Sequence, residues 1–200
     1  MSDDSNRPAP DPSQPPSAGP YSQQIQQTSV AARLPERVAS GIFSSGVIVM
    51  EGPDEFVLDF VQGLSRPPRV GARVVLSPNV MSQFVSALRD NLGRYEQAFG
   101  PPKLVPKPNS DRRPSIQEIY QDLRLPDDVL SGVYANTVMI GHSPSEFLLE
   151  FITRFFPTAA VSARIYVASS QVPQMLAGMT AALQNRRGRQ GEHHEPPSGN

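Results

Sequence analysis

Two arginines and two acids recur at matching positions of this 200-residue chain and could form charged sites. Asp59 and Arg73 lie in one stretch, and Glu150 and Arg164 follow 91 residues later. All four are expected on strands, where an acid and an arginine on adjacent antiparallel strands meet directly. The pattern is typical either of a guanidinium that anchors an anionic ligand or of a structural ion pair. We favour structural pairs, with these members: Arg73 with Asp59 or Glu55, and Arg164 with Glu150 or Glu146.

The acids alone do not indicate acid–base catalysis. Residues 55–60 alternate, so Phe56 and Phe60 share one face, and Glu55 and Asp59 share the other. We expect this second face to be exposed to solvent. Catalysis needs a pocket and a perturbed pKa, and the pattern indicates neither.

The three histidines are weak candidates for chemistry. His142 is expected in a turn, where Glu146 could complete a hydrolytic site. The residue at the equivalent position 91 residues earlier is Glu51, so we favour a lone exposed histidine. His193 and His194 lie in a polar tail, where adventitious metal binding is the alternative to no role. We therefore expect no catalytic residue, no metal site and no cofactor.

A short basic cluster follows the last expected helix, and it contains Arg186, Arg187 and Arg189. These side chains could contact nucleic-acid phosphates or stabilise the carboxyl end of the helix. No aromatic residue lies between them to stack on bases. Nucleic acid is therefore an unlikely partner.

An internal duplication organises the chain. The stretch 53–60 reads PDEFVLDF, and the stretch 144–151 reads PSEFLLEF. With the same offset of 91 residues, 16 of 59 positions between 34 and 92 are identical to their counterparts. A constant offset over that length indicates a tandem repeat.

Each repeat is expected to fold as β-β-β-α. The predicted strands are 47–50, 55–60 and 70–76 in the first repeat, and 133–140, 146–152 and 160–167 in the second. Ser77-Pro78 predicts a helix start and Gly100 its end, while Ser169 and Ser170 could cap the second helix. Met139, Met175 and Met179 occupy core-type positions, although a methionine-rich face could also bind a partner.

The predicted fold class is α+β, with two tandem β-β-β-α repeats packed as a pseudo-dimer. The boundaries are a disordered proline-rich tail at 1–33, the first repeat at 34–99, a proline-rich linker with a short helix at 100–124, the second repeat at 125–187, and a disordered tail at 188–200. Repeats this small bury marginal cores, so we expect them to stabilise each other or to use a partner chain.

Composition excludes several classes of protein. The net charge is −1, so no global field attracts nucleic acid or an anionic membrane. The absence of cysteine excludes disulfides and thiolate chemistry. The first 20 residues have no apolar core that would indicate a secretory signal, and no apolar run reaches the roughly 18 residues of a membrane-spanning helix. We expect a cytoplasmic protein without a membrane partner.

Several motifs resemble one family. They are Tyr134-Ala135-Asn136, Glu146 to Phe151 and Arg164-Ile165 in the second repeat, and Glu55 to Phe60, Arg73 to Pro78, Tyr95-Glu96 and Phe99-Gly100 in the first. Together they resemble the bacterial and archaeal family catalogued as domain of unknown function 3467. The first repeat departs from it at Phe43-Ser44-Ser45, and the second lacks the Tyr-Glu and Phe-Gly ending. The resemblance implies a fold and no reaction.

The leading functional hypothesis is a non-catalytic protein-interaction or assembly module, with an unknown protein partner or a homo-oligomer. The alternative is a nucleic-acid-associated protein that uses the C-terminal arginine cluster. A third possibility is a small enzyme or ligand-binding domain with a site between the repeats, next to Arg73 or Arg164.

Overall fold

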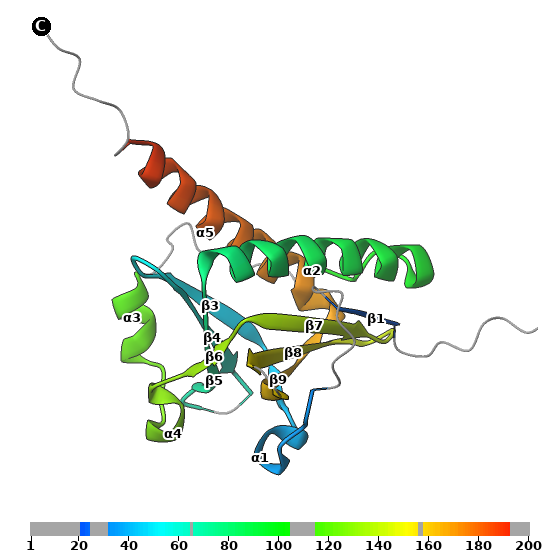
Figure 1. Cartoon of the computed structure of the whole chain (residues 1–200), viewed down its shortest axis with the longest axis horizontal. Helices are drawn as coiled ribbons and strands as arrows, with labels where there is room; N and C mark the ends of the chain where they lie inside the picture. The colour runs from blue at the N-terminus through cyan, green and yellow to red at the C-terminus, as the bar shows by residue number, and fades with distance from the viewer. Residues whose placement is uncertain (1–20, 25–31, 65, 105–114, 156–157, 193–200) are drawn as a thin grey trace, which may run out of the picture.

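The computed structural model describes residues 21–24, 32–64, 66–104, 115–155 and 158–192. It confirms the α+β class, with helices packed on two β-sheets (Figure 1). The described strands are β1 (Tyr21–Gln24), β2 (Ile42–Ser44), β3 (Gly46–Glu51), β4 (Phe56–Gln62), β5 (Arg69–Leu76), β6 (Val133–Ala135), β7 (Thr137–His142), β8 (Glu146–Phe155) and β9 (Thr158–Ala168). The helices are α1 (Glu36–Ala39), α2 (Pro78–Phe99), α3 (Ile116–Gln121), α4 (Asp127–Leu130), the 3₁₀ turn η1 (Ser169–Gln171) and α5 (Val172–Glu192).

The two sheets exchange short strands. One sheet has the order β3-β4-β5-β6 and the other β1-β7-β8-β9-β2. The strands β3, β4 and β5 form an antiparallel meander, and so do β7, β8 and β9. Strand β6 of the second repeat pairs in parallel with β5, and β2 of the first repeat pairs in parallel with β9. Each sheet is therefore completed by a strand from the other repeat.

One residue in each repeat lets the chain change sheets. Asn136, between β6 and β7, donates its backbone N–H to the Ile152 carbonyl at 3.0 Å. Its side-chain amide also accepts from the Arg154 N–H at 2.8 Å and donates to the Arg154 carbonyl at 2.9 Å. The equivalent residue, Ser45, accepts from the Gly63 N–H at 2.9 Å. The continuous strand that the sequence predicted before His142 is therefore two strands in different sheets.

Local sequence signals set the ends of the helices. The Ser77 side chain accepts from the Val80 N–H at 3.4 Å, and Pro78 begins α2. Gly100 ends the helix with φ of 81°, a conformation that glycine adopts without a steric penalty. Ser115 and Glu118 form a capping box at the start of α3. These ends agree with the sequence prediction.

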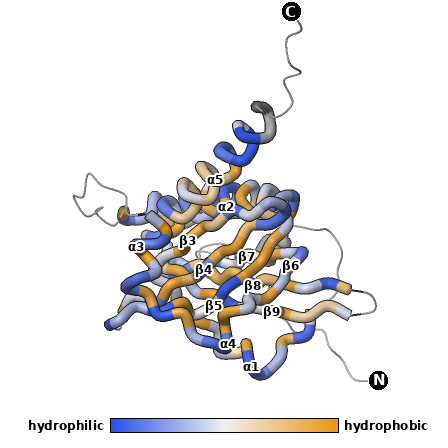
Figure 2. Tube along the Cα trace, turned by 90° about the vertical axis from the view of Figure 1, so that its left-hand side faces the viewer, coloured by the Kyte–Doolittle hydropathy of each residue, from blue (hydrophilic) through white to orange (hydrophobic). Residues whose placement is uncertain are grey.

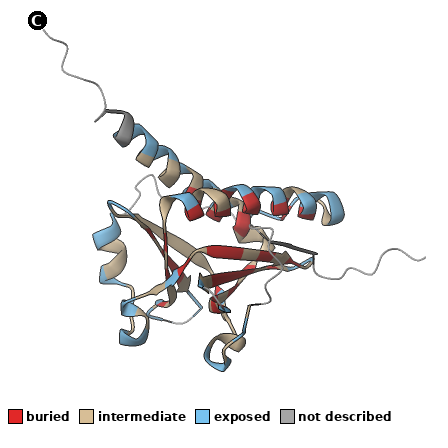
Figure 3. Cartoon of the chain, in the orientation of Figure 1, coloured by how far each residue is buried: buried red, intermediate tan, exposed pale blue. Residues whose placement is uncertain are grey.

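A single hydrophobic core joins both repeats. Helix α2 contacts β7 of the second repeat, and α5 contacts β3 of the first. The two helices cover one side of the sheets, and α1 and α4 lie at the opposite end (Figure 1). The apolar residues follow the strands (Figure 2), and buried residues lie on α2 and on the strands beneath it (Figure 3). The largest fully buried aromatic residues are Phe56, Phe60, Phe84, Phe147 and Phe151.

The structure differs from the predicted boundaries at both ends. Strand β1 lies inside the stretch assigned to the first tail and pairs with β7. Helix α5 runs to Glu192, beyond the predicted end of the second repeat at 187. The rest of the first tail before Ala32, and the chain from 193 on, lie outside the described residues.

Gly41 and Gly132 directly precede the exchanged strands β2 and β6, so substitution of these glycines tests the packing at the exchange point. A Cβ on Gly132 would lie 2.8 Å from Arg73 Cγ, and one on Gly41 would lie 3.0 Å from Arg164 Cγ. Both glycines also have positive φ, 70° and 63°. We expect Gly132→Ala and Gly41→Ala each to lower the free energy of unfolding by roughly 1–3 kcal/mol. Urea denaturation measures the change.

The matched control is Gly93→Ala, since Gly93 lies in α2 and a Cβ there meets no atom within 4 Å. This substitution is expected to raise the free energy of unfolding by roughly 0.5–1 kcal/mol. Equal effects of all three substitutions would contradict the proposed crowding at the exchange point.

Candidate functional site

Two buried ion pairs occupy equivalent places in the two sheets. Arg73 lies directly opposite Asp59 and donates Nε and Nη2 to its two carboxylate oxygens, each at 2.8 Å. Arg164 lies opposite Glu150 and donates to Oε1 from Nε at 2.8 Å and from Nη2 at 2.5 Å. Hydrogen bonding to Asp59 raises the pKa of Arg73. Asp59 is 0% exposed, so its face of the strand is buried and not solvent-facing as predicted.

The same arginines connect the repeats. Nη1 of Arg73 donates to the carbonyl of Leu130, the last residue of α4, at 2.9 Å. Nη1 of Arg164 donates to the carbonyl of Ala39, the last residue of α1, at 3.0 Å. Each guanidinium therefore neutralises an acid of its own sheet and binds the short helix of the other repeat.

Tyr120 of α3 adds a third group to the first ion pair. Its hydroxyl contacts Asp59 Oδ2 and lies 3.4 Å from Arg73 Nη2 and 3.6 Å from Met50 Sδ. Burial, followed by hydrogen bonding to Asp59, raises the pKa of Tyr120 to about 12. Helix α3, which the sequence placed in the linker, therefore covers this face of the first sheet.

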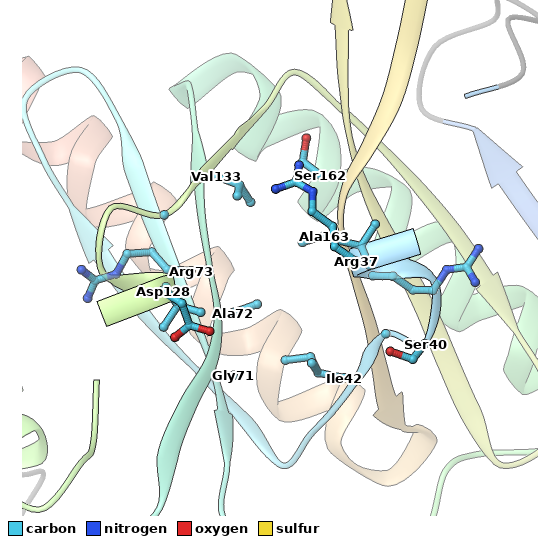
Figure 4. A pocket seen from close by; sticks show the side chains of 15 residues that line it. Arg37, Ser40, Ile42, Gly71, Ala72, Arg73, Asp128, Val133, Ser162 and Ala163 are labelled. Atoms are coloured by element: carbon cyan, nitrogen blue, oxygen red, sulfur yellow. The ribbon is translucent and has the colours of Figure 1, made fainter. Parts of the chain in front are cut away.

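A cavity of about 320 Å³ lies between the repeats, next to both arginines (Figure 4). The guanidinium groups of Arg37 and Arg73 point outward on opposite sides, while Ile42 and Val133 line the space between them. The lining contains serine hydroxyls and the Asp128 carboxylate, but no histidine or cysteine. Arg73 and Arg164 of this lining are each bound to a carboxylate and to a carbonyl at the end of a short helix.

The other two acid candidates belong to hairpin turns. Glu55 accepts from the backbone N–H of Asp54 at 3.3 Å. Glu146 accepts from the Ser143 hydroxyl at 2.8 Å. Hydrogen bonds from Ser145 and Ser143 lower the pKa of Glu146. Neither acid pairs with Arg73 or Arg164, whose partners are Asp59 and Glu150.

Arg186 stabilises the fold. It donates to the carbonyls of Gly52 and Pro53, and its guanidinium carbon lies 5.7 Å from the Phe56 ring centroid. The residue 91 positions earlier, Tyr95, donates to the Pro144 carbonyl at 2.8 Å. The two side chains therefore serve equivalent hairpins, although their chemistry differs.

The other arginines of the C-terminal cluster lie farther along α5. Arg189 pairs with Glu51, which also lies 3.6 Å from Arg186. Arg187 is exposed. Two of the three predicted nucleic-acid contacts are therefore engaged with the first repeat.

His142 is buried, contrary to the predicted exposed turn. It is the last residue of β7, is 2% exposed, and packs edge-on against Tyr95 and Phe99 at centroid distances of 5.9 and 6.3 Å. Burial, with a smaller contribution from the positive charge of Arg94, lowers the pKa of His142. The other two histidines lie outside the described residues.

Sequence analysis missed four exposed apolar residues. Phe43 and Tyr134, which are 44% and 45% exposed, occupy equivalent positions on β2 and β6. Leu64 and Phe155, which are 86% and 61% exposed, are also separated by 91 residues. The alignment of the two repeats contains a signal for these residues, because both pairs of equivalent positions are apolar although polar turns lie beside them.

Further features of the described residues bear on metal binding, on membrane insertion and on the methionines. No cluster of three or more metal-ligating side chains occurs within them. Their helices include none with the length and apolar character needed to cross a membrane. Met175 and Met179 lie in the core, and Met139 packs against a second small apolar cluster.

The fold and site define an α+β protein built from two interlocked units whose strand arginines are committed to the structure. The chain belongs to the family described as protein of unknown function (DUF3467), which it matches over residues 3–104 and 106–193. The two adjacent matches agree with the tandem duplication and confirm the resemblance noted in the sequence. Comparisons with curated proteins and with solved structures gave no match.

The first ion pair is tested by a double-mutant cycle. Arg73→Met leaves a buried carboxylate without its cation, so it is expected to lower the free energy of unfolding by about 3–5 kcal/mol. Combining it with Asp59→Leu is expected to recover much of that loss. Urea denaturation of the wild type, both single variants and the double variant gives the coupling energy. Additive effects would contradict a direct interaction.

His142 predicts a loss of stability in mild acid. Its folded-state pKa is below the ordinary value of 6.5, so the unfolded chain binds the proton first. The free energy of unfolding should therefore fall as the pH drops below about 6.5. In His142→Gln this part of the fall should disappear.

The measurement is the urea midpoint between about pH 7.5 and pH 5.5, the window of histidine titration. A variant with both His193→Gln and His194→Gln serves as the control and should keep the wild-type slope. An unchanged slope in His142→Gln would assign the acid sensitivity to another group.

Proposed function

We propose that this chain is a non-catalytic protein-interaction module in which the two repeats act as one pseudo-dimeric body. One observation carries the proposal: each repeat exposes an aromatic residue on its exchanged strand and a large apolar residue at the end of a hairpin strand. Exposed apolar groups that cluster mark interaction surfaces more often than single exposed residues do.

The second repeat offers a flat aromatic surface. The rings of Tyr134 and Phe155 are stacked, with centroids 6.3 Å apart and an interplanar angle of 9°. In the first repeat, Phe43 and Leu64 border one groove. Rigid aromatic groups lose little conformational entropy on binding, which favours their use as anchors.

Two surfaces at equivalent places on one folded body would support bivalent binding. A partner that carries two matching segments would gain avidity from the fixed distance between the sites. A second copy of the chain could also occupy these surfaces, and the chain would then act as an assembly module.

The nucleic-acid alternative has less support. Arg186 and Arg189 bind Glu51 and hairpin carbonyls, so phosphate contacts would have to replace intramolecular ones. Arg187 of that cluster is exposed and makes no such contact with the first repeat. Binding of nucleic acid would therefore compete with the contact between α5 and the first sheet.

The test removes the aromatic surface of the second repeat with Tyr134→Ser and Phe155→Ser. Loss of two anchor residues is expected to reduce partner capture from source cells by about tenfold or more. Quantitative mass spectrometry after nuclease treatment measures capture, and circular dichroism checks the fold.

The control variant carries Leu104→Ser and Ile116→Ser, two exposed apolar residues outside both pairs. It should capture as the wild type does. Equal capture by both variants would contradict the proposal, and capture abolished by nuclease would support the nucleic-acid alternative. Light scattering of the same samples shows whether the partner is a second copy of the chain.

A further inference from the structure

The exposed groove of the first repeat combines apolar and cationic groups. Its volume is about 510 Å³, and its lining residues are Phe43, Gln62, Leu64, Arg66, Pro67, Arg69 and Arg124. We infer that this groove binds an acidic peptide segment that also carries apolar side chains. The inference rests on the proposed interaction function and specifies the chemistry of one partner.

The three arginines provide unused hydrogen-bond donors. Arg69 Nε donates to Gln62 Oε1 at 2.8 Å, and all three residues are exposed. Within the described part of the chain, no carboxylate forms an ion pair with Arg66, Arg69 or Arg124. The lining itself contains no acid. A guanidinium binds a carboxylate through two parallel hydrogen bonds, so the groove is complementary to acidic side chains.

The backbone holds Arg124 in place independently of its side chain. The Val70 N–H donates to the Arg124 carbonyl, and the Arg124 N–H donates to the Pro68 carbonyl, each at 2.9 Å. Arg124 thereby forms an isolated parallel β-bridge with Arg69, the first residue of β5. The backbone of Arg124 is therefore fixed at the edge of β5, and its guanidinium forms no ion pair within the described residues.

The second repeat keeps an arginine at the position of Arg124 but lacks the charge at the position of Arg69. Arg33 takes the place of Arg124, with the same backbone bonds to the start of β9. Ala160, however, stands where the first repeat has Arg69, and Thr153 stands where it has Gln62. The equivalent site of the second repeat therefore carries fewer arginines than the groove of the first repeat, in which three arginines lie.

The geometry favours a peptide over a nucleic acid. The arginines converge on one compact groove, whereas a nucleic-acid backbone needs a track of cations along successive phosphates. Phe43, Leu64 and Pro67 provide apolar contacts beside the charges. A short segment with alternating acidic and apolar side chains satisfies both kinds of group.

Fluorescence anisotropy of the full chain tests this inference. The probe is a labelled peptide of alternating glutamate and leucine, and the comparison probes are the same peptide with lysine for glutamate and a single-stranded oligouridine. The wild type should bind the acidic peptide, and added salt should weaken the binding. Replacing Arg66 and Arg124 by glutamine should weaken it by about tenfold or more, because two charge-assisted contacts are lost.

The matched control replaces Arg33 and Arg37 by glutamine, which changes the net charge equally. Arg33 is also equivalent to Arg124 in backbone pairing. The inference is overturned if the wild type does not bind the acidic peptide, if both double variants lose the same affinity, or if the lysine peptide binds as well. Preferential oligouridine binding that depends on Arg66 and Arg124 would assign the groove to nucleic acid and also overturn it.

This outcome is separable from the test of the proposed function. Peptide binding through Arg66 and Arg124, together with unaffected capture by the Tyr134 and Phe155 variant, would support the inference and contradict the paired-surface proposal. Loss of capture by the Tyr134 and Phe155 variant, together with no binding of the acidic peptide to the wild type, would support the paired-surface proposal and contradict the inference.

Discussion

Charge compensation of a buried carboxylate is the constraint on which the rest of the structure depends. Asp59 has no contact with solvent, so it requires a cation and additional hydrogen bonds to be tolerated. Arg73 provides the cation, and the same guanidinium reaches the carbonyl end of α4. Glu150 and Arg164 repeat this arrangement toward α1. The same guanidinium groups therefore neutralise the acids and join the repeats. Neither repeat completes its sheet alone.

At two equivalent contacts between the repeats, a difference in one residue is matched by a difference in the residue that it contacts. Tyr95 and Arg186 both donate to a proline carbonyl in a hairpin of the other repeat. The neighbour of Tyr95 is the aromatic His142, whereas the equivalent Glu51 lies beside Arg186. An aromatic pair at one contact between the repeats thus corresponds to an ion pair at the equivalent contact. This coupling explains why the second repeat lacks the tyrosine of the family motif while its helix keeps the same position.

The sequence predicted what local signals determine. Ser77, Pro78 and Gly100 fixed the limits of α2, and the alternation from Phe56 to Phe60 identified a buried strand face. The exchange of β2 and β6 was not predictable in this way, because pairing between short distant strands has no local signature. Burial of Asp59 depends on α3, which lies outside the duplicated pattern. His142 was misplaced because burial of a strand end depends on Tyr95 and Phe99 from another element.

The positions that differ between the repeats fall into two groups with different physical meanings. Within the core and at the exchange points, residues that differ between the repeats make the same kind of contact. Ser45, for example, accepts a hydrogen bond from a backbone N–H, as Asn136 does. At the exposed ends, apolar character is retained although solvent exposure gives it no stabilising role. Around Phe43 the first repeat carries the charge of Arg69, whereas the equivalent residue of the second repeat is Ala160. Stability accounts for the first group, whereas the interaction function proposed above would account for the second.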